Sequence, residues 1–435
     1  MPTERRRLLL LFLAALAIRL AWVLSVSRGG MAWNDALFYH QNGYNLGHGK
    51  TYGNLQGKPF ASWPPGYSAM LAVMYRIFGF REVVGQVFNA FAGALTVPLL
   101  YKLVRAPFGA RVALIAASIL TVMPGPILWT DMILTETVYT LLLVVFFLLL
   151  MRAQPTWKWA LILGGYLGLV ALVRSEAVMW FLLLPLLWRK QFRWKAMVSH
   201  VGIAAVAMLL VLTPWAIRNT TTMGSFIPLS TNGGGTLYSG HNPNATGMQS
   251  YPTKEVTDQY PFGDNWEVEF TSGLQHRAID YMVHHPVQEL ILIPKKLLAL
   301  SRGDSYAFEW INQDPYPTVG PVWATYIGVV ADLAWFTLLS LTLVGVFGLG
   351  RTLWRTKLLR MIGAMFGLTL VLYGFLYYGN YRYRVPYETL MMVVAALVID
   401  RGWRGLQAAR AADLDLELEV AAAVPADAET AADAS

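Results

Sequence analysis

The segment that decides the fold is residues 134–151, LTETVYTLLLVVFFLLLM, in which Glu136 is the one charged residue. A helix that crosses the hydrocarbon core of a bilayer needs roughly 20 predominantly apolar residues, and a shorter stretch suffices inside a bundle. The segment therefore predicts a membrane-spanning helix that starts near Glu136.

The composition of the whole chain agrees with this prediction. Of the 435 residues, 56% are hydrophobic and 14% are charged, whereas soluble domains carry roughly 25% charged residues. This excludes a soluble multidomain protein and a disordered chain. The net charge of +8 does not indicate a nucleic-acid partner, because surplus Lys and Arg in so apolar a chain mark cytoplasmic loops. The absence of cysteine excludes disulfides and thiol catalysis.

We predict an all-α polytopic membrane protein with about ten transmembrane helices. Residues 8–26 exceed the roughly 7–15 residues of a signal-peptide core, so we expect a retained helix. We expect Arg19 to face the bundle or a wet cavity and to pair with an acidic neighbour. The stretches 159–173 and 177–188 are short and lie on either side of Arg174. A broken or re-entrant element is therefore the alternative to two regular spans for this pair. The apolar stretches are 8–26, 83–104, 110–129, 134–151, 159–173, 177–188, 196–214, 322–350, 358–379 and 385–400.

The basic residues predict the orientation. With the N-terminus in the cytoplasm, more than half of the 34 Lys and Arg residues fall in short inner segments, as the positive-inside rule requires. Both termini are then cytoplasmic, and two long segments, 27–81 and 215–321, lie outside. We expect juxtamembrane helices in both and a small α/β region in 215–321. Residues 411–435 are Ala-rich and acidic, which predicts a disordered cytoplasmic tail.

Asp35 is the first candidate functional residue on the outer face. It follows the first span and lies among Trp33, Phe38 and Tyr39. A carboxylate near the bilayer surface and among aromatic rings is partly desolvated, which prepares it to take a proton as a general base. The structural alternative is an N-cap for a helix that begins near Ala36.

Two further charged residues border the same compartment. Glu136 lies where its helix starts, so stabilisation by the helix dipole is one sufficient reason for it, and a second acidic group in the cavity of Asp35 is the other. Lys58 lies in the first outer segment, ahead of the sequence Pro64-Pro65-Gly66-Tyr67. It either meets an anion or is a solvated loop lysine.

The outer ends of two later spans carry arginines and tyrosines. Arg218 lies in PWAIRN (214–219), and Arg382, Tyr383 and Arg384 lie in YRYRVP (381–386). Such arginines are often lipid-headgroup snorkels, but guanidinium groups also bind phosphate in a bidentate manner. A phosphate-bearing lipid is therefore a natural ligand. The seven histidines show no metal-ligand spacing, so no metal site is predicted and divalent-metal dependence stays open.

In this order and at these membrane positions, the motifs resemble the C-type (GT-C) glycosyltransferase superfamily. The similarity is greatest to the bacterial family-39-like branch related to protein O-mannosyltransferases and the lipid A aminoarabinose transferase. It covers nearly the whole chain to residue 400. The motifs that carry it are Asp35, Pro64-Pro65-Gly66-Tyr67, Thr135-Glu136, Pro214-Trp215 with Arg218-Asn219, the stretch 230–244, and Arg382-Tyr383-Arg384-Val385-Pro386.

The resemblance implies a GT-C transmembrane catalytic domain over residues 1–400. It implies a hexosyl- or pentosyltransferase that moves a sugar from a polyprenyl-phosphate donor to a hydroxyl of a lipid, glycan or protein. The reaction would occur at the periplasmic face of a bacterial inner membrane. We expect a monomer, and the sequence shows no requirement for a cofactor. An essential aspartate in such enzymes maps onto Asp35, and a second acidic residue maps onto Glu136. The sequence has Asn34-Asp35 where the protein mannosyltransferases have an Asp-Glu pair, which makes a protein acceptor doubtful.

The chemistry expected of such an enzyme assigns roles to the candidate residues. Asp35 would act as the general base, and displacement from the opposite face would invert the anomeric carbon. The departing phosphate would be held by the basic and phenolic candidates, namely Lys58, Arg218, Arg382, Arg384 and Tyr383. The alternative from another class is a transporter or flippase for lipid-linked saccharides, which would place polar residues through the membrane midplane.

Overall fold

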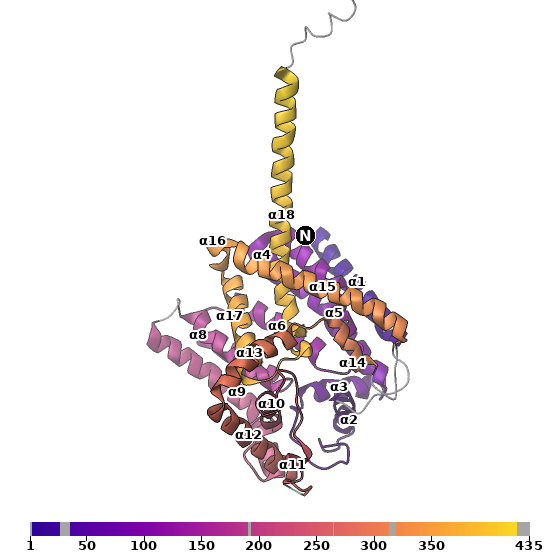
Figure 1. Cartoon of the computed structure of the whole chain (residues 1–435), viewed down its shortest axis with the longest axis vertical. Helices are drawn as coiled ribbons and strands as arrows, with labels where there is room; N and C mark the ends of the chain where they lie inside the picture. The colour runs from indigo at the N-terminus through magenta and orange to yellow at the C-terminus, as the bar shows by residue number, and fades with distance from the viewer. Residues whose placement is uncertain (1, 27–34, 190–192, 264, 313–318, 424–435) are drawn as a thin grey trace, which may run out of the picture.

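The computed structural model describes residues 2–26, 35–189, 193–263, 265–312 and 319–423. These residues form helices joined by short connections (Figure 1), and the one β-bridge among them joins Gly53 and Pro59. The predicted all-α class is confirmed.

Five helices are long and apolar enough to cross a membrane. They are α1 (Pro2–Val26), α4 (Glu82–Val122), α9 (Trp194–Met223), α15 (Pro321–Gly348) and α17 (Lys357–Val371), the last continued by a short π-helical turn, η3 (Leu372–Leu376). Together they indicate a multi-pass membrane protein. The predicted count of about ten spans is not confirmed, partly because several predicted spans are short helices: α6 (Glu136–Arg152), α7 (Trp157–Ala171) and α8 (Leu183–Trp188).

Helix α4 contains two of the predicted spans and is broken between them. Gly109 has φ 84° and ψ 173° and separates the two arms, within the predicted break at 105–109. This backbone region is essentially restricted to glycine. Because nothing lies within 4 Å of a Cβ built at Gly109, a substitution there is opposed by backbone strain alone.

Gly109→Ala is therefore expected to destabilise the protein by about 1–3 kcal/mol, measured as thermal unfolding in detergent. Gly165→Ala is the matched control, since Gly165 lies within helical α7 and also has nothing within 4 Å of an added Cβ. The control is expected to melt at or above the wild-type temperature. Equal shifts for the two variants would contradict this explanation of the break.

The pair of short apolar stretches around Arg174 forms a broken element. After α7 the backbone is extended at Arg174 (φ −143°, ψ 120°) and then forms a 3-10 helix, η1 (Ser175–Leu182), which leads into α8. This agrees with the alternative to two regular spans. The break places Arg174 and Glu176, which are 10% and 12% exposed, between α7 and α8.

Arg19 faces the bundle interior, as expected, and is 1% exposed, but its hydrogen bonds go to backbone carbonyl oxygens and not to the expected acidic neighbour. Its guanidinium donates to the carbonyl oxygens of Leu120 (3.0 Å) and Thr121 (3.4 Å), close to the C-terminus of α4. Carbonyl groups without helical partners, at the negative end of a helix dipole, compensate the buried cation.

The regular secondary structure of the outer segment 215–321 is helical in the residues that the structure describes. It contains α10 (Asn232–Gly240), α11 (Lys254–Thr257), α12 (Trp266–His284), α13 (Pro286–Leu300), η2 (Asp304–Ala307) and α14 (Phe308–Ile311). The predicted α/β character is not found in these residues. The buried positions of α12 are Glu267, Leu274 and Ala278, and the spacing of seven between Glu267 and Leu274 fits one face of a helix but not the two-residue period of a strand.

The first outer segment supplies α2 (Asp35–Gly47) and α3 (Gly66–Phe78). Figure 1 shows α2, α10, α11 and α12 at one end of the molecule, and the N-terminus and the far part of α18 (Tyr381–Ala423) at the other. Residues 411–423 were expected to be disordered, but they continue α18, because Ala, Leu and Glu are strong helix formers. Residues 424–435 of that predicted tail lie outside the described residues.

Candidate functional site

Five charged side chains form a continuous series of ion pairs. Arg382 Nη1 lies 2.8 Å from Asp35 Oδ2, and Arg382 Nε contacts Glu136 Oε1. Glu136 Oε1 also lies 2.8 Å from Arg174 Nη1, and Arg174 Nε lies 2.9 Å from Glu176 Oε1. Carboxylates and guanidinium groups alternate along the series, so every charge has an opposite neighbour.

Helix starts bring most of this ion-pair network together. Asp35 opens α2 and Glu136 opens α6, where a carboxylate is favoured by the helix dipole. Arg382 lies in the first turn of α18, and Arg174 and Glu176 lie at the break after α7. Asp35 is the first residue of α2 and not a cap before it, Glu136 lies in the first turn of α6, and both residues also join the network.

Glu136 lies behind the cavity and does not line it. Its side chain is 0% exposed, and the Nη1 of Arg174 bonds both Glu136 and the hydroxyl of Thr135, at 3.1 Å. A buried carboxylate of this kind is stable only when cations compensate it. Any influence of Glu136 on a ligand would therefore be transmitted through Arg382 and Arg174.

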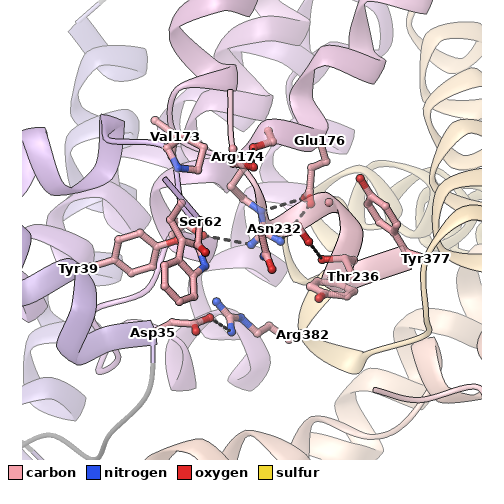
Figure 2. Close-up of a pocket in the computed structure, with 17 residues that line it drawn as sticks. Asp35, Tyr39, Ser62, Val173, Arg174, Glu176, Asn232, Thr236, Tyr377 and Arg382 are labelled. Carbon is pink, nitrogen blue, oxygen red and sulfur yellow. Dashed lines mark hydrogen bonds and ion pairs between the residues drawn. The ribbon is translucent and has the colours of Figure 1, made fainter. Parts of the chain in front are cut away.

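A polar cavity of about 120 Å³ lies next to the network. In Figure 2, Tyr39 and Ser62 lie on one side of it and Thr236 and Tyr377 on the other, with the dashed contact of Asp35 and Arg382 between them. Hydroxyl and amide groups both donate and accept hydrogen bonds, which suits sugar hydroxyls. Further polar lining residues are Thr135, Ser175, Ser230, Asn232 and Tyr383.

A second, larger hollow, the apolar groove, has a volume of about 800 Å³. Asp35 and Trp63 line both the polar cavity and the groove. Lys58 lines the groove but not the polar cavity, so it shares a hollow with Asp35 and lies outside the ion-pair network. Most of the other lining side chains are aromatic or aliphatic, among them Phe38, Leu55, Phe60, Met223, Phe262 and Trp266.

Arg218 lines neither hollow, contrary to its predicted place around a shared site. Its Nη1 donates to the carbonyl oxygen of Phe60 at 2.8 Å, and its Nη2 donates to that of Tyr52. The guanidinium also lies 4.9 Å from the ring centroid of Trp215. Arg218 therefore supports the first outer segment, because its donors are used by backbone carbonyls of that segment.

Arg384 is also absent from both linings. Residues two apart on a helix point about 200° apart, so Arg382 and Arg384 cannot share a face once α18 begins at Tyr381. Arg384 pairs instead with Asp304 and lies 3.3 Å from Glu388, with its guanidinium 3.7 Å from the ring centroid of Trp335. Burial raises the pKa of Asp304 to about 6.

Tyr383 does line the polar cavity. Its hydroxyl donates to that of Tyr378 at 2.5 Å, and the guanidinium of Arg174 lies 5.7 Å from its ring centroid. Among the predicted residues, the structure thus brings Asp35, Arg382 and Tyr383 to one cavity, with Glu136 behind it and Lys58 in the adjoining groove.

The Pro64-Pro65-Gly66-Tyr67 sequence docks α3 onto the broken element. Gly66 N donates to the carbonyl oxygen of Leu172 at 2.6 Å, and a Cβ at Gly66 would lie 2.6 Å from that oxygen. Tyr67 is fully buried, and its hydroxyl donates to Asn89 at 3.0 Å. Glycine is required here for close backbone approach, and the contact fixes the chain just before Arg174.

Arg174 and Glu176 are the functional candidates that the sequence reasoning missed. The available signal was an Arg-Ser-Glu sequence between two short apolar stretches, since charges at membrane depth are commonly functional. In the part of the chain that the structure describes, no group of three or more His, Asp or Glu side chains is arranged to hold a metal ion.

A family model, described as dolichyl-phosphate-mannose-protein mannosyltransferase, matches residues 62–217. No curated protein matches the chain.

Several solved structures are similar to it. The oligosaccharyltransferase of Archaeoglobus fulgidus is similar at a TM-score of 0.51 and 14% identity, over 95% of this chain and 52% of that one. Archaeal oligosaccharyltransferase AglB from the same organism, in complex with an inhibitory peptide and a dolichol-phosphate, has a TM-score of 0.50 and 16% sequence identity. The similarity covers 95% of this chain and 52% of that one. ArnT from Cupriavidus metallidurans bound to undecaprenyl phosphate has a TM-score of 0.41 and 15% sequence identity, and the similarity covers 90% of this chain and 77% of that one.

This chain spans about half the length of the archaeal enzymes. Its likeness to them, at low identity, is one of fold. The family match falls on residues 62–217, which include the start of α6, the broken element and most of α9. The comparisons therefore show a likeness to the mannosyltransferase family model over residues 62–217 and a fold shared with the archaeal oligosaccharyltransferase.

Proposed function

We propose that the protein transfers a sugar from a polyprenyl-phosphate donor to an acceptor hydroxyl. The observation that carries the proposal is the position of Asp35, which is paired with Arg382 and borders both the polar cavity and the apolar groove. A group-transfer enzyme needs a base at the point where two substrates meet. The family description names a dolichyl-phosphate sugar, and the AglB structure holds a dolichol-phosphate.

In this mechanism Asp35 takes the proton of the acceptor hydroxyl. The acceptor oxygen forms a bond to the anomeric carbon while the bond from that carbon to the phosphate oxygen breaks, and the phosphate leaves with the electron pair. Attack from the face opposite the phosphate inverts the anomeric centre. A phosphate is already a good leaving group, so cationic stabilisation matters more than a general acid.

Arg382 lines the polar cavity beside Asp35 and is the first candidate to hold the departing phosphate. Tyr383 and Lys58 are the second and third, from the cavity and the groove. We do not assign this role to Arg218 and Arg384, because they line neither the polar cavity nor the apolar groove. The hydroxyl-rich lining of the cavity is the proposed place of the sugar, of hexose or pentose type.

The proposed setting is the outer face of a bacterial inner membrane, with both termini in the cytoplasm. The N-terminus and the far part of α18 lie at the same end of the molecule, opposite α2 and α10 (Figure 1), which supports this orientation. One chain supplies the whole ion-pair network, so a monomer suffices. A transporter is less well supported, because the network lies where α2, α6 and α18 begin and does not follow a path along the spans.

The test is a transfer assay with the purified protein in lipid nanodiscs. Polyprenyl-phosphate-linked hexoses and pentoses are supplied with lipid and glycan hydroxyl acceptors, and products are identified by mass spectrometry. We expect free polyprenyl phosphate and a new glycoside in equal amounts, with an inverted anomeric configuration by NMR. Movement of a labelled donor across proteoliposomes without any glycoside would instead indicate the transporter.

A further inference from the structure

Glu267 is a buried carboxylate that accepts hydrogen bonds from two separate outer segments. It lies in the first turn of α12 and is 6% exposed. Ala61 N donates to its two oxygens at 3.1 and 3.3 Å, and Ser62 Oγ donates at 3.1 Å. Thr231 Oγ1 donates to it at 2.5 Å. Charge-assisted hydrogen bonds of this kind are stronger than neutral ones.

The two segments that meet at Glu267 form different parts of the polar cavity. Ser62, Trp63 and Pro64 line it from the first outer segment, and the stretch 230–236 lines it from the second, through Ser230, Asn232, Gly233 and Thr236. Figure 2 shows Ser62 and Thr236 on opposite sides. The segments also touch directly, since Thr231 N donates to the carbonyl oxygen of Ala61 at 3.1 Å.

Helix α12, which carries this carboxylate, is packed tightly against its neighbour. It packs against α10 so closely that a Cβ at Gly234 would lie 2.0 Å from the carbonyl oxygen of Thr271. Leu274 and Ala278 of α12 are buried against Tyr238 of α10. Since helices in such close contact have little freedom to slide, the position of α12 fixes the position of Glu267 relative to the cavity.

Glu267 is held by neutral donors. Its hydrogen-bond partners are a backbone N–H and two hydroxyl groups, and the described residues include no ion pair with it. Burial raises its pKa, while the bonds from Thr231, Ala61 and Ser62 and the positive charge of Arg218 oppose the rise. A buried carboxylate without a paired cation is costly to a protein.

The segment that Glu267 holds separates the two hollows. Trp63, next to Ser62, lines both the polar cavity and the apolar groove, as Asp35 does. Its ring lies 4.5 Å from that of Phe38, in the same helix as Asp35. A shift of residues 61–63 therefore changes the shape of the cavity in front of Asp35.

We propose that Glu267 is a positioning residue for the transfer reaction: it holds residues 61–63 against Thr231 and so sets the width of the sugar cavity beside Asp35. The inference rests on the proposed function. Glu267 itself lines the apolar groove, and from α12 it contacts two walls of the polar cavity.

The test compares Glu267→Ala and Glu267→Gln with Glu269→Gln, a control on an exposed glutamate of the same helix. We expect Glu267→Ala to raise the KM for the lipid-linked donor about tenfold, with a smaller change in kcat, and the control to behave as wild type. Gln keeps one acceptor oxygen, so its KM is expected to lie between the two. Loss of folded protein alone would lower the apparent kcat and leave KM unchanged, and that result would overturn the proposal.

Hydrogen exchange measured by mass spectrometry supplies a readout that needs no activity. In Glu267→Ala, peptides that cover residues 58–64 and 229–236 are expected to exchange faster, because the Ala61 amide loses its acceptor and the Thr231 amide its fixed partner. Unchanged exchange in both peptides would overturn the proposal. If the wild-type protein transfers no sugar at all, the proposed function is wrong. The exchange data then still report whether Glu267 joins the two segments.

Discussion

Asp35→Asn is expected to lower the rate of sugar transfer by about 10²–10⁴-fold with little change in donor affinity. Asparagine keeps an oxygen that can accept from Arg382, which lies 2.8 Å from the carboxylate in the wild type. It cannot take the proton of the acceptor hydroxyl, so the chemical step loses its base. The measurement is kcat and KM with a purified polyprenyl-phosphate sugar.

Asp258→Asn is the matched control, since Asp258 is an exposed acid at the end of α11 in the outer segment. It is expected to retain wild-type kcat and KM. Full transfer activity in Asp35→Asn would show that Asp35 is not the base. A loss of donor affinity with unchanged kcat would instead reassign Asp35 to substrate binding through Arg382.

Arg384→Ala is expected to lower the free energy of unfolding by about 3–5 kcal/mol. Asp304 and Glu388 are 2% and 0% exposed, and Arg384 is the cation that contacts both. Its removal leaves two carboxyl groups in a buried site without compensation, and it also removes the cation packed on Trp335. Thermal unfolding in detergent measures the loss.

A second variant separates this role from phosphate binding. In Arg384→Ala combined with Asp304→Asn and Glu388→Gln, no buried charge is left unpaired, so part of the lost stability is expected to return. If Arg384 held the donor phosphate, Arg384→Ala would melt near the wild-type temperature and would show a raised donor KM. That outcome would contradict the structural role.

The site shows what residue spacing can and cannot predict. The position of charged and phenolic residues at the outer ends of apolar stretches predicts Asp35, Arg382 and Tyr383, and the structure brings all three to one cavity. The same rule predicts Arg384, which faces elsewhere because α18 begins at Tyr381 and its residues then follow helical geometry. Spacing from a span does not give the side on which a residue lies.

The position of a residue relative to an apolar stretch does not predict the contacts of Glu176 and Glu267, for a different reason. Glu176 contacts Arg174 only because the chain breaks after α7, and Glu267 meets Ala61 across more than 200 residues of sequence. Contacts between distant segments depend on packing that no local pattern encodes.

The sequence alone determined the class of the protein, because hydrophobic length and the scarcity of charge are properties of composition that a bilayer selects directly. It also determined where the charged residues would be found, because a charge inside a span costs free energy and a charge at the outer end of a span costs less. The tertiary structure alone decided which of those charges pair. Arg382 pairs with Asp35 and Glu136, and Arg384 with Asp304, because the direction of a side chain is set by helix phase and by the packing of elements far apart in the chain.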